Sequence, residues 1–412
     1  MKKPLALRRV AMISTSYAPW ILGGAERSLQ ELAEELTSQG ISVRILTIGP
    51  KSEGTTVSHI GGVEIIRFGS RAFIPFQAGN VNVSLSQKVR FHLAEMSRVP
   101  TLRFLRRELV RFNPDVVHLH NLAGIGWVAW LAVRGLPSVQ SLRDYYLICL
   151  KTTADHNGKS CAKARTLCGL RRLSFRLCKS RPTVFAAVSD GMVRVHRAAG
   201  SVTNTDEVFT VYNQPTKPAR LENQTEGREI FGLFGTISHE KGTWVAVEAF
   251  KQARDLAPSA GLKLIVAGTG STAQLLLLAA VVAEDRDITA VGVISPEQFY
   301  SLVNAVIVPT QWEEPFGRVA AETLLAGRTL IASAVGGLPE VTKLYGGNYL
   351  LVNDFRNVAV WADSILEVFA AIPNFRRSTI PLSTSVSAVL ESIYLQAISM
   401  KLRRPRTHSD HV

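Results

Sequence analysis

Two glutamates late in the chain have a spacing that suits the binding of hydroxyl and phosphate groups. Residues 313–317 read Glu-Glu-Pro-Phe-Gly, and seven residues separate Glu314 from Glu322. A helix that begins near Phe316 would leave Glu314 in the preceding loop and place Glu322 about two turns along. The first N–H groups of such a helix can bind phosphate, and the carboxylates can accept hydrogen bonds from sugar hydroxyls. The alternative is two solvated glutamates at a helix end.

Glycine-rich stretches at two other places are suited to binding an anion. Residues 23–26 read Gly-Gly-Ala-Glu before an expected helix, so N–H groups near Gly24 can approach a negative charge. Residues 235–242 read Gly-Thr-Ile-Ser-His-Glu-Lys-Gly. There Gly235 permits a tight turn, and Lys241 lies near the next expected helix as a point charge for a diphosphate. The alternatives are an ordinary strand-to-helix turn and a solvated surface lysine.

Histidine and charged residues follow two further expected strands. Residues 117–121 read Val-His-Leu-His-Asn, and strand alternation puts His118 and His120 on the same face. His120 is the stronger functional candidate, and packing is the alternative for both rings. Arg143 and Asp144 follow the expected strand Ser138–Leu142. A surface ion pair with Asp144 is the plain alternative to a functional role for this arginine.

All four cysteines of the chain fall in one basic stretch. They are Cys149, Cys161, Cys168 and Cys178. Such clustering in a cytosolic protein favours a metal site over a disulfide framework. The spacings do not match a standard zinc ribbon or finger. A structural zinc or disulfide site therefore stays open beside reduced thiols, which are the default, and no other metal site is predicted.

Residues 86–112 have the pattern of a basic amphipathic helix. Apolar residues recur at helical spacing at Val89, Leu93, Met96, Leu102, Leu105 and Leu109. Arginines fall largely between them, at positions Arg90, Arg98, Arg103, Arg106, Arg107 and Arg111. A face of this kind suits docking to an anionic bilayer. The alternative is a core-facing apolar stripe with a solvated basic face.

The charge of the whole chain agrees with an anionic ligand or surface. The 412 residues include 47 Lys and Arg against 33 Asp and Glu, a formal net charge of +14. No signature of a nucleic-acid-binding module is present, so no nucleic-acid partner is expected. Polar residues and Pro19 interrupt the apolar stretch near the N-terminus, and the apolar runs 123–133 and 275–283 are too short to cross a bilayer as a helix. We expect a cytoplasmic protein, with peripheral contact to the inner face of the cell membrane.

These residues lie at the ends of strands in a predicted α/β fold. Short β-branched runs alternate with helix-length amphipathic segments, which favours parallel sheets flanked by helices. The strands expected in the first half are 10–14, 42–48, 63–68, 116–120, 138–142 and 184–188. Those expected in the second half are 230–234, 262–267, 288–291, 305–308 and 329–333. The first helix is expected at residues 25–39.

The chain is too long for one ordinary α/β core and divides at a polar stretch, residues 215–228. We predict one domain over residues 1–212, a second over 213–375, and a C-terminal segment with a loose basic tail over 376–412. Ligands of open parallel sheets bind outside the carboxyl ends of the strands. The cleft between the two domains is therefore the expected site.

The motifs above resemble, in their order along the chain, the retaining nucleotide-sugar glycosyltransferases of family 4, also called glycosyl transferases group 1. Further matching motifs are Val-Gly at 291–292, Val-Pro at 308–309 and Gly-Gly-Leu-Pro-Glu at 336–340. The resemblance covers nearly the whole chain and implies the GT-B fold, with two Rossmann-like, doubly wound parallel-sheet domains facing a central cleft. It implies that the N-terminal domain binds the acceptor and the C-terminal domain the nucleotide-diphosphate sugar.

The resemblance also implies roles for single residues. Glu314 contacts the donor sugar, Glu322 the ribose and Lys241 the diphosphate, while His120 lies against the transferred sugar. Glu314, Lys241 and His120 form the predicted catalytic set. The predicted donor-binding set is Gly24, Gly235, Thr236, Val293, Phe316, Gly317, Arg318 and Glu322, and the acceptor-side candidates are Arg143 and Asp144.

Two positions depart from the family pattern. The family usually has an arginine directly after the glycine of the turn, where this chain has Thr236. One positive charge on the leaving diphosphate is therefore missing or comes from elsewhere, and Arg318 is a candidate. Many members also have His-Asp where this chain has Arg143 and Asp144. This arginine could bind an anionic acceptor, supply the missing positive charge, or form a surface ion pair with Asp144.

The implied reaction transfers a sugar from the nucleotide to a glycan or lipid-linked acceptor, with retention at the anomeric carbon, in cell-surface polysaccharide biosynthesis. No metal or other cofactor is expected, since no Asp-x-Asp motif is evident near the predicted cleft residues. Two alternatives stay open. A nucleotide-sugar epimerase of the same fold would need no acceptor. A catalytically inactive, glycosyltransferase-like binding protein would explain Thr236 and Arg143 as decay.

Overall fold

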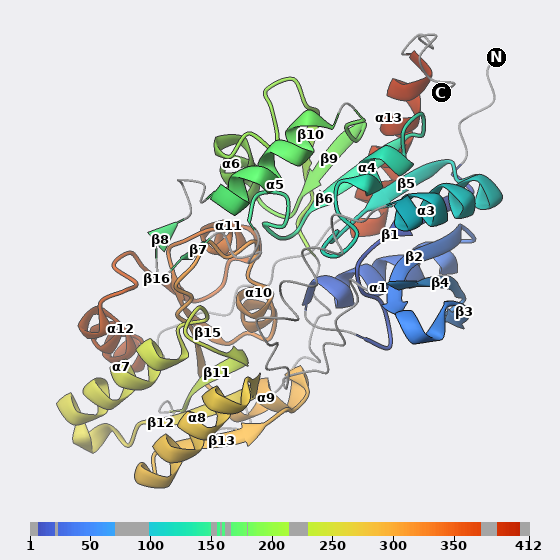
Figure 1. The fold of residues 1–412 in the computed structure, drawn as a ribbon. Coiled ribbons are helices and arrows are strands. Elements are labelled where there is room, and N and C mark those ends of the chain that lie inside the picture. Colours follow the sequence, from blue (N-terminus) through green and yellow to red (C-terminus); the bar gives the residue numbers. More distant parts are fainter. Residues whose placement is uncertain are drawn as a thin grey trace.

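The protein consists of two α/β domains, each built on a largely parallel sheet with helices on both faces (Figure 1). The computed structural model describes residues 7–20, 24–70, 99–149, 155–156, 159–160, 166–178, 180–213, 230–371 and 385–403. The first domain holds an eight-stranded sheet and the second a six-stranded sheet. The predicted α/β fold with two parallel-sheet domains is therefore confirmed.

The sheet of the first domain has the order β10-β9-β6-β5-β1-β2-β4-β3. Its strands are β1 (Arg9–Ile13), β2 (Ser42–Pro50), β3 (Thr55–Ile60), β4 (Val63–Ser70), β5 (Val116–Leu119), β6 (Ser138–Leu142), β9 (Val184–Ala187) and β10 (Val208–Thr210). Only β3 runs antiparallel to its neighbour, β4. The six strands predicted in this half are all present. The edge strands β3 and β10 were not predicted, because β3 alternates exposed and half-exposed residues and β10 has only three residues.

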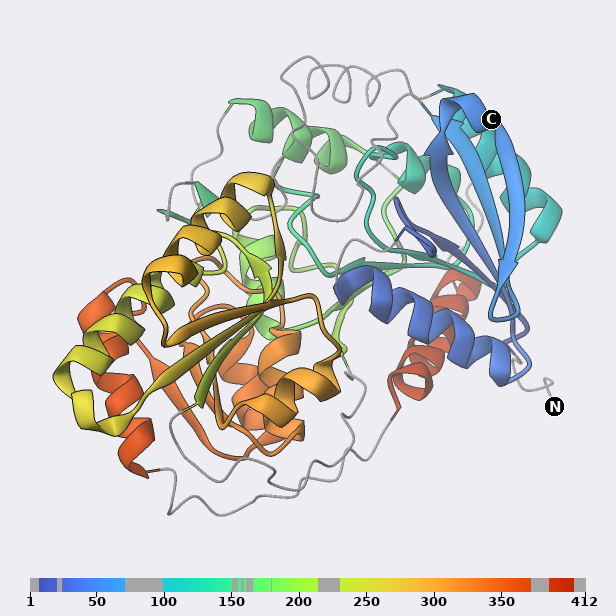
Figure 2. The ribbon, with the colours of Figure 1, turned by 90° about the horizontal axis from the view of Figure 1, so that it is seen from below.

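Helices cover both faces of this sheet, as Figure 2 shows from below. Alternate residues of β1 point to opposite faces, so Val10 and Met12 join one core while Ala11 and Ile13 join the other. The first core lies under α1 (Gly24–Ser38) and α13 (Val386–Arg403), and the second under α3 (Val99–Phe112), α4 (Val128–Ala132) and α5 (Thr166–Leu177). The remaining elements of this half are η1 (Lys51–Glu53), α6 (Asp190–Ala198) and the two-stranded ribbon of β7 (Asp155–His156) and β8 (Lys159–Ser160).

Residues 386–403 of the predicted C-terminal segment are helical, and this helix was not predicted. They form α13, which returns from the second domain to pack on the first domain beside α1 (Figures 1 and 2). Leu390, Tyr394 and Ala397 recur at helical spacing and are buried in the core, where α13 contacts α1, β5 and β6. Glu391, Ser392 and Gln396 lie between them and Lys401 and Arg403 follow, so the composition did not reveal this apolar stripe.

The sheet of the second domain is wholly parallel, with the order β13-β12-β11-β14-β15-β16. Its strands are β11 (Ile230–Ile237), β12 (Lys263–Gly270), β13 (Ile288–Gly292), β14 (Ala305–Val308), β15 (Thr329–Ser333) and β16 (Tyr349–Val352). Its helices are α7 (Thr243–Leu256), η2 (Pro258–Ala260), α8 (Thr272–Glu284), α9 (Pro296–Leu302), α10 (Arg318–Leu325), α11 (Leu338–Tyr345) and α12 (Val358–Ala371). Counted from β11, the strand order is that of a doubly wound nucleotide-binding sheet. The five strands predicted here are present, and the short edge strand β16 is additional.

One local prediction in the second domain is wrong. Gly235 and Thr236 do not form a turn after the strand, because β11 continues through them to Ile237 and pairs with β12 along its whole length. The turn consists of residues 238–242 and ends at Gly242, directly before α7. A side chain at Gly242 would place its Cβ 1.8 Å from the Pro309 carbonyl oxygen, so only glycine fits there.

The two domains share a continuous apolar contact. Phe316 and Leu338 of the second domain belong to the same buried cluster as Tyr145 and Met192 of the first. The Tyr145 hydroxyl donates a hydrogen bond to the Glu313 carbonyl at 3.0 Å. Among the described helices, none is long and apolar enough to span a membrane.

Candidate functional site

The candidate site lies where the carboxyl ends of the central strands of both sheets meet. In each sheet the chain first adds strands on one side of its first strand and then crosses to the other side. The crossover point lies between β1 and β5 in the first sheet and between β11 and β14 in the second. Crevices at such points are the usual ligand sites of doubly wound sheets. Predicted residues lie in the segments that follow three of these strands. His120 comes directly after β5, Lys241 lies in the turn after β11, and Glu314 lies in the segment after β14.

Lys241 and Glu314 form an ion pair at this edge of the second domain. Lys241 Nζ lies 2.7 Å from Glu314 Oε2 and 5.3 Å from the centre of the Trp312 ring. The Thr310 hydroxyl donates to the same carboxylate oxygen at 3.3 Å. The Glu314 side chain is 12% exposed and that of Lys241 39% exposed, so the lysine remains within reach of a ligand. The structure thus brings together two members of the predicted catalytic set.

The Gly-Gly-Leu-Pro-Glu motif fixes the backbone of Glu314. Gly337 N donates to the Glu314 carbonyl at 2.7 Å. Gly336 has φ of 61°, and a Cβ there would lie 2.3 Å from the Glu314 carbonyl oxygen. The backbone of Glu314 can approach this closely only because position 336 is glycine. At the end of the motif, Glu340 accepts hydrogen bonds from Asp190 N and Gly191 N at the start of α6, which links the two domains.

Helix α10 begins beside this ion pair and has no side-chain cap. Gly317 is its N-cap residue, with φ of 94°, and among the described residues no side chain forms a capping hydrogen bond there. The Phe316 side chain is buried in the core, so only its backbone can face a ligand. An uncapped helix start of this kind is suited to binding a phosphate group.

Glu322 lies in the second turn of α10, as predicted, and is largely buried. Its Oε1 lies 2.7 Å from Arg318 Nε, and the Tyr300 hydroxyl lies 3.4 Å from its Oε2. Burial raises the pKa of the Glu322 carboxyl, and the hydrogen bond from Arg318 opposes that rise. The guanidinium of Arg318 therefore holds the Glu322 carboxylate at the site.

Arg318 also connects the site to the first domain. Its Nη2 lies 3.0 Å from Glu31 Oε1, and its Nη1 lies 3.3 Å from the Ser28 hydroxyl, both on α1. A Cβ built at Gly24, the first residue of α1, would lie 3.4 Å from Arg318 Cδ. The start of α1 and the start of α10 thus converge on one guanidinium group.

The other predicted donor-side residues are less tightly associated. Gly235 faces α10, since a Cβ there would lie 4.0 Å from Val319 Cγ2, and Thr236 is exposed in β11. Val293 follows β13 at the carboxyl edge and is 76% exposed. Their contacts to a donor remain predictions.

His118 and His120 lie on the same side of β5, as the alternation predicts, with ring centres 3.9 Å apart. His118 is a packing residue, with ring nitrogens 2.7 Å from the Tyr394 hydroxyl and 2.8 Å from the Ser141 hydroxyl. Neither buried ring nitrogen of His120 has a partner among the described residues. Burial, then His118 and Arg143, lower the pKa of His120, which keeps its imidazole neutral.

Arg143 and Asp144 each bind a partner other than one another. Arg143 Nη1 donates to Asn213 Oδ1 at 2.9 Å, and Asp144 Oδ1 accepts from Tyr146 N at 2.8 Å. Burial lowers the pKa of Arg143 to about 10 and raises that of Asp144 to about 6. The Tyr345 hydroxyl of the second domain donates to the Asn213 carbonyl at 2.8 Å, which places Arg143 and its partner Asn213 at the interdomain contact.

The proposed four-cysteine site is only partly covered by the described residues. Cys149, Cys168 and Cys178 are free thiols, and Cys149 and Cys178 are buried. Cys161 lies outside the described residues. Within the part of the chain that is described, no group of three or more His, Cys, Asp or Glu side chains is arranged to hold a metal ion. A structural site on the four cysteines stays a prediction.

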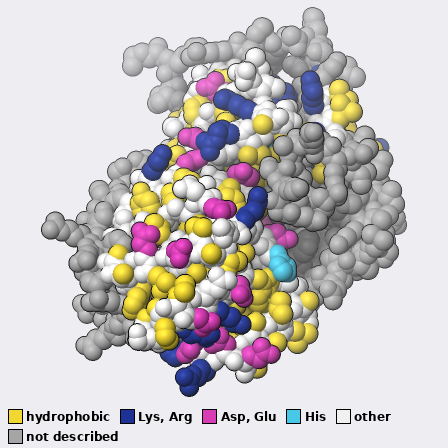
Figure 3. Space-filling model, turned by 90° about the vertical axis from the view of Figure 1, so that its left-hand side faces the viewer, with side chains coloured by type: hydrophobic (Ala, Val, Ile, Leu, Met, Phe, Trp, Pro, Cys, Tyr) yellow, Lys and Arg dark blue, Asp and Glu magenta, His cyan; other side chains and the backbone are white. Residues whose placement is uncertain are grey.

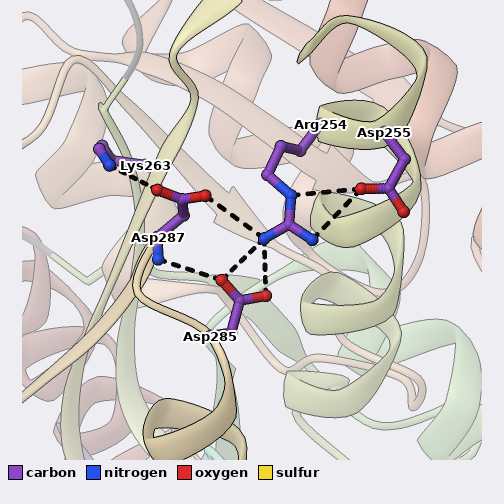
Figure 4. A network of polar contacts seen from close by, with 5 residues as sticks. All are labelled: Arg254, Asp255, Lys263, Asp285 and Asp287. Atoms are coloured by element: carbon purple, nitrogen blue, oxygen red, sulfur yellow. Dashed lines mark hydrogen bonds and ion pairs between the residues drawn. The ribbon is translucent and has the colours of Figure 1, made fainter.

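One Asp-x-Asp sequence lies in the second domain, at Asp285 and Asp287, and it belongs to a different edge of the sheet. Both carboxylates bind Arg254, and Lys263 Nζ lies 2.5 Å from Asp287 Oδ1 (Figure 4). The two aspartates directly precede β13, so they lie at the amino end of the strand, opposite the candidate site. This network ties α7 to the sheet and is structural.

Sequence reasoning missed Glu31 and Ser28, which complete the contacts of Arg318. Their spacing contained a signal, since Gly24, Ser28 and Glu31 recur every three to four residues and therefore share one helix face. That face begins at the glycine stretch already singled out as an anion site. Tyr145, which contacts the backbone of Glu313 from the other domain, was also missed.

Comparison with known proteins agrees with this geometry. Residues 23–213 match the family model of the glycosyl transferase 4-like domain, and residues 228–371 match that of glycosyl transferases group 1. An uncharacterized 42.6 kDa protein in the cps region of Klebsiella pneumoniae is 28% identical over 355 residues, 83% of this chain and 89% of that protein. Lipopolysaccharide 1,2-N-acetylglucosaminetransferase of Salmonella typhimurium is 36% identical over 129 residues, 29% of this chain and 33% of that enzyme.

Solved structures share the fold over nearly the full length. Sucrose-phosphate synthase of Thermosynechococcus elongatus has a TM-score of 0.63 at 18% identity, covering 96% of both chains. HepE of Anabaena, solved in complex with UDP, has a TM-score of 0.62 at 15% identity, covering 96% of this chain and 97% of that chain. The chain therefore belongs to the GT-B glycosyltransferases, with a glycosyl transferase 4-like first domain and a second domain of glycosyl transferases group 1.

Proposed function

We propose that this glycosyltransferase is retaining and metal-independent, and that it moves a sugar from a nucleoside diphosphate sugar to a glycan or lipid-linked acceptor. The observation that carries the proposal is the ion pair of Lys241 and Glu314 beside the uncapped start of α10, where Glu322 lies. A cation, free N–H groups and two carboxylates at one edge suit a diphosphate, a sugar and a ribose.

In this proposal the catalytic power comes from stabilising the charge that develops on the departing diphosphate. Lys241 supplies one cation, and the N–H groups of Gly24, Phe316 and Gly317 supply hydrogen-bond donors. Glu314 orients the donor sugar, and neutral His120 contacts it from the first domain. The leaving phosphate accepts the proton of the acceptor hydroxyl, so no protein nucleophile is required.

The domains divide the two substrates between them. Residues 213–375 bind the donor, and residues 1–212 bind the acceptor, with Arg143 and Asp144 on the acceptor side. The UDP complex of HepE supports a nucleotide donor. The relatives from a capsular-polysaccharide (cps) region and from lipopolysaccharide synthesis support a role in cell-surface polysaccharide biosynthesis.

The place of action is the cytoplasmic face of the membrane, where a lipid-linked acceptor would be reached from one side. The support is α3, where Arg103, Arg106 and Arg107 are exposed beside Val110, which is 80% exposed. Residues 86–98 of the predicted basic helix lie outside the described residues. Exposed arginines next to an exposed aliphatic side chain suit an anionic interface.

The test combines a donor screen with a transfer assay. Nucleotide sugars with different bases are first ranked by thermal shift, because a ligand of the native state raises its stability. The bound donor is then incubated with protein and lipid extract, with and without excess chelator, and the product linkage is determined by NMR. We expect transfer with retained anomeric configuration in both arms.

Each component of the proposal can fail separately. An inverted anomeric centre would contradict retention. Activity that is lost in chelator and restored by Mg²⁺ or Mn²⁺ would contradict metal independence. An altered sugar nucleotide formed without acceptor would identify an epimerase, and donor binding without any turnover would identify an inactive binding protein.

A further inference from the structure

The guanidinium of Arg318 is shared by acidic groups from both domains. Its Nε binds Glu322 Oε1 at 2.7 Å within α10, and its Nη2 binds Glu31 Oε1 at 3.0 Å across the cleft. Its Nη1 lies 3.4 Å from Glu31 Oε2 and 3.3 Å from the Ser28 hydroxyl. The side chain is only 18% exposed, so this arrangement lies inside the interdomain contact and not on a free surface.

This guanidinium occupies the position where the proposed donor would be bound. The Cδ of Arg318 lies against Gly24 at the start of α1, and its guanidinium binds the carboxylate of Glu322. Under the proposed function these two groups face the diphosphate and the ribose. The nucleotide therefore cannot reach both groups without changing at least one contact of Arg318.

The charges around Arg318 determine which contact changes. Glu31 lies two turns after Gly24 on the same face of α1, so its carboxylate would repel a diphosphate at the start of that helix. A diphosphate and Glu31 are thus competing acceptors for one cation. Thr236 supplies no charge at the position where the family has an arginine, so the diphosphate has one cation fewer on the β11 side.

We infer that Arg318 is the second cation of the diphosphate site and that Glu31 restrains it in the donor-free state. When the donor binds, its diphosphate replaces Glu31 as the partner of Arg318, while Nε keeps its place beside Glu322. The exchange breaks the only ion pair from α1 to α10 among the described residues, so donor binding loosens this interdomain bridge. This inference rests on the proposed donor site, and it assigns to Glu31 a role that opposes donor binding.

Binding measurements on the full chain with UDP, GDP and inorganic pyrophosphate test the inference. The variants are Glu31→Gln, Arg318→Gln and the double variant, with Glu34→Gln on the same helix as the matched control. We expect Glu31→Gln to tighten diphosphate binding about fivefold, because it removes a competing anion. We expect Arg318→Gln to weaken it about tenfold or more, because a charge-assisted contact is lost. In the Arg318→Gln background, Glu31→Gln should tighten binding by much less than fivefold, because only the direct repulsion between its carboxylate and the diphosphate is then removed.

The phosphate dependence separates this role from a purely structural one. Uridine and guanosine, which carry no phosphate, should bind the Glu31→Gln variant and the wild type equally. If both single variants change diphosphate affinity in the same direction, Arg318 is only a bridge between the domains and the inference is wrong. It is also wrong if Glu31→Gln leaves diphosphate affinity unchanged.

Lys241→Ala distinguishes failure of this inference from failure of the proposed donor site. Weaker UDP or GDP binding in Lys241→Ala, without the expected responses at Glu31 and Arg318, would reject the inference alone. If the wild type binds none of the three diphosphate probes and transfers no sugar, the donor site and the inference are both rejected.

Discussion

At the scale of single residues, the ion pair of Lys241 and Glu314 makes a direct prediction about turnover. Glu314→Gln keeps the shape of the side chain and removes its charge. A group that orients the sugar acts mainly in the transition state, so we expect kcat to fall about a hundredfold with little change in KM. Steady-state kinetics on the folded variant measure this effect.

Glu313→Gln is the matched control for that experiment, since it makes the same chemical change one residue earlier. Only the backbone of Glu313 contacts Tyr145, so its kinetics should stay close to those of the wild type. A near-normal kcat for Glu314→Gln would mean that this glutamate only neutralises Lys241 and has no catalytic role.

Asp144 makes a prediction about stability and pH. Burial raises the pKa of this carboxyl to about 6 in the folded protein, while the hydrogen bond from Tyr146 N opposes that rise. Between about pH 4 and pH 6 the folded state keeps a proton on Asp144 that the unfolded state has released. The contribution of Asp144 to the free energy of unfolding therefore falls as pH rises through this range, and it is constant above about pH 6. Asp144→Asn should remove this loss and stabilise the protein at neutral pH by at most about 3 kcal/mol.

Urea unfolding of the wild type and of Asp144→Asn at several pH values between 4 and 8 measures the difference. The variant keeps an oxygen that can accept from Tyr146 N, so the local turn is preserved. The gain in unfolding free energy should grow between pH 4 and 6 and stay level above. A difference that does not change with pH would show that the carboxyl has an ordinary pKa.

Some residues of the site were predictable from the sequence and others were not. Glu314, Lys241 and Glu322 stand in ordered motifs at strand ends, where the topology of parallel sheets brings them together. Glu31 lies 287 residues before Arg318 and in the other domain, so their contact depends on how the domains meet. Local patterns contain no information of that kind.

At the scale of elements, the loop before α11 controls the position of Glu314. Gly336→Ala would drive a Cβ into the Glu314 backbone, in addition to the strain of a positive φ. We expect a loss of stability greater than the roughly 1 kcal/mol that αL strain alone causes, together with a clear fall in kcat. Thermal unfolding and steady-state kinetics test both effects.

Gly327 provides the control for that substitution. It has φ of 70°, close to that of Gly336, but a Cβ there meets nothing within 4 Å. Gly327→Ala should therefore show the backbone strain alone, with normal kinetics. Equal effects of the two variants would mean that the contact of Gly336 with Glu314 has no role in catalysis.

Among the elements, strands were more predictable than the helix that completes the first domain. Strands such as β1, after Arg9, and β9 are continuous apolar runs because both faces of the sheet are covered. In α13 polar residues such as Glu391, Ser392 and Gln396 lie among the buried ones, and the packing partners α1, β5 and β6 are far away in the sequence. The apolar stripe becomes recognisable only once those partners are known.

At the scale of the whole molecule, the excess of basic residues is unevenly distributed. Figure 3 shows a face on which Lys and Arg are mixed with Asp and Glu. On α3, by contrast, Arg103, Arg106, Arg107 and Arg111 are exposed, while the one acid of the helix, Glu108, is buried beneath Arg107. The proposal of an anionic interface therefore applies to this face of the first domain.

Reversing the charges of α3 tests that interface. Replacing Arg103, Arg106 and Arg107 by Glu should lower partitioning to anionic liposomes at least about tenfold at low salt, because each basic residue near the surface contributes about 1 kcal/mol. The effect should shrink as salt rises, since exposed charges are screened. Sedimentation with phosphatidylserine-containing vesicles measures it.

An equal change of net charge elsewhere is the control. Arg286, Lys343 and Arg356 are exposed on the second domain, and replacing all three by Glu should leave sedimentation nearly unchanged. Similar losses in both triple variants would point to net charge alone. Absence of wild-type binding to these vesicles would reject the membrane interface.

The return of α13 to the first domain has a consequence for the order in which the protein can fold during synthesis. The ribosome makes this helix after every other described element, yet it covers an apolar face built on β1, the first strand. The second domain, residues 230–371, is complete before α13 emerges. The first domain must therefore expose part of its core until α13 has been made, and during that time it depends most on chaperones.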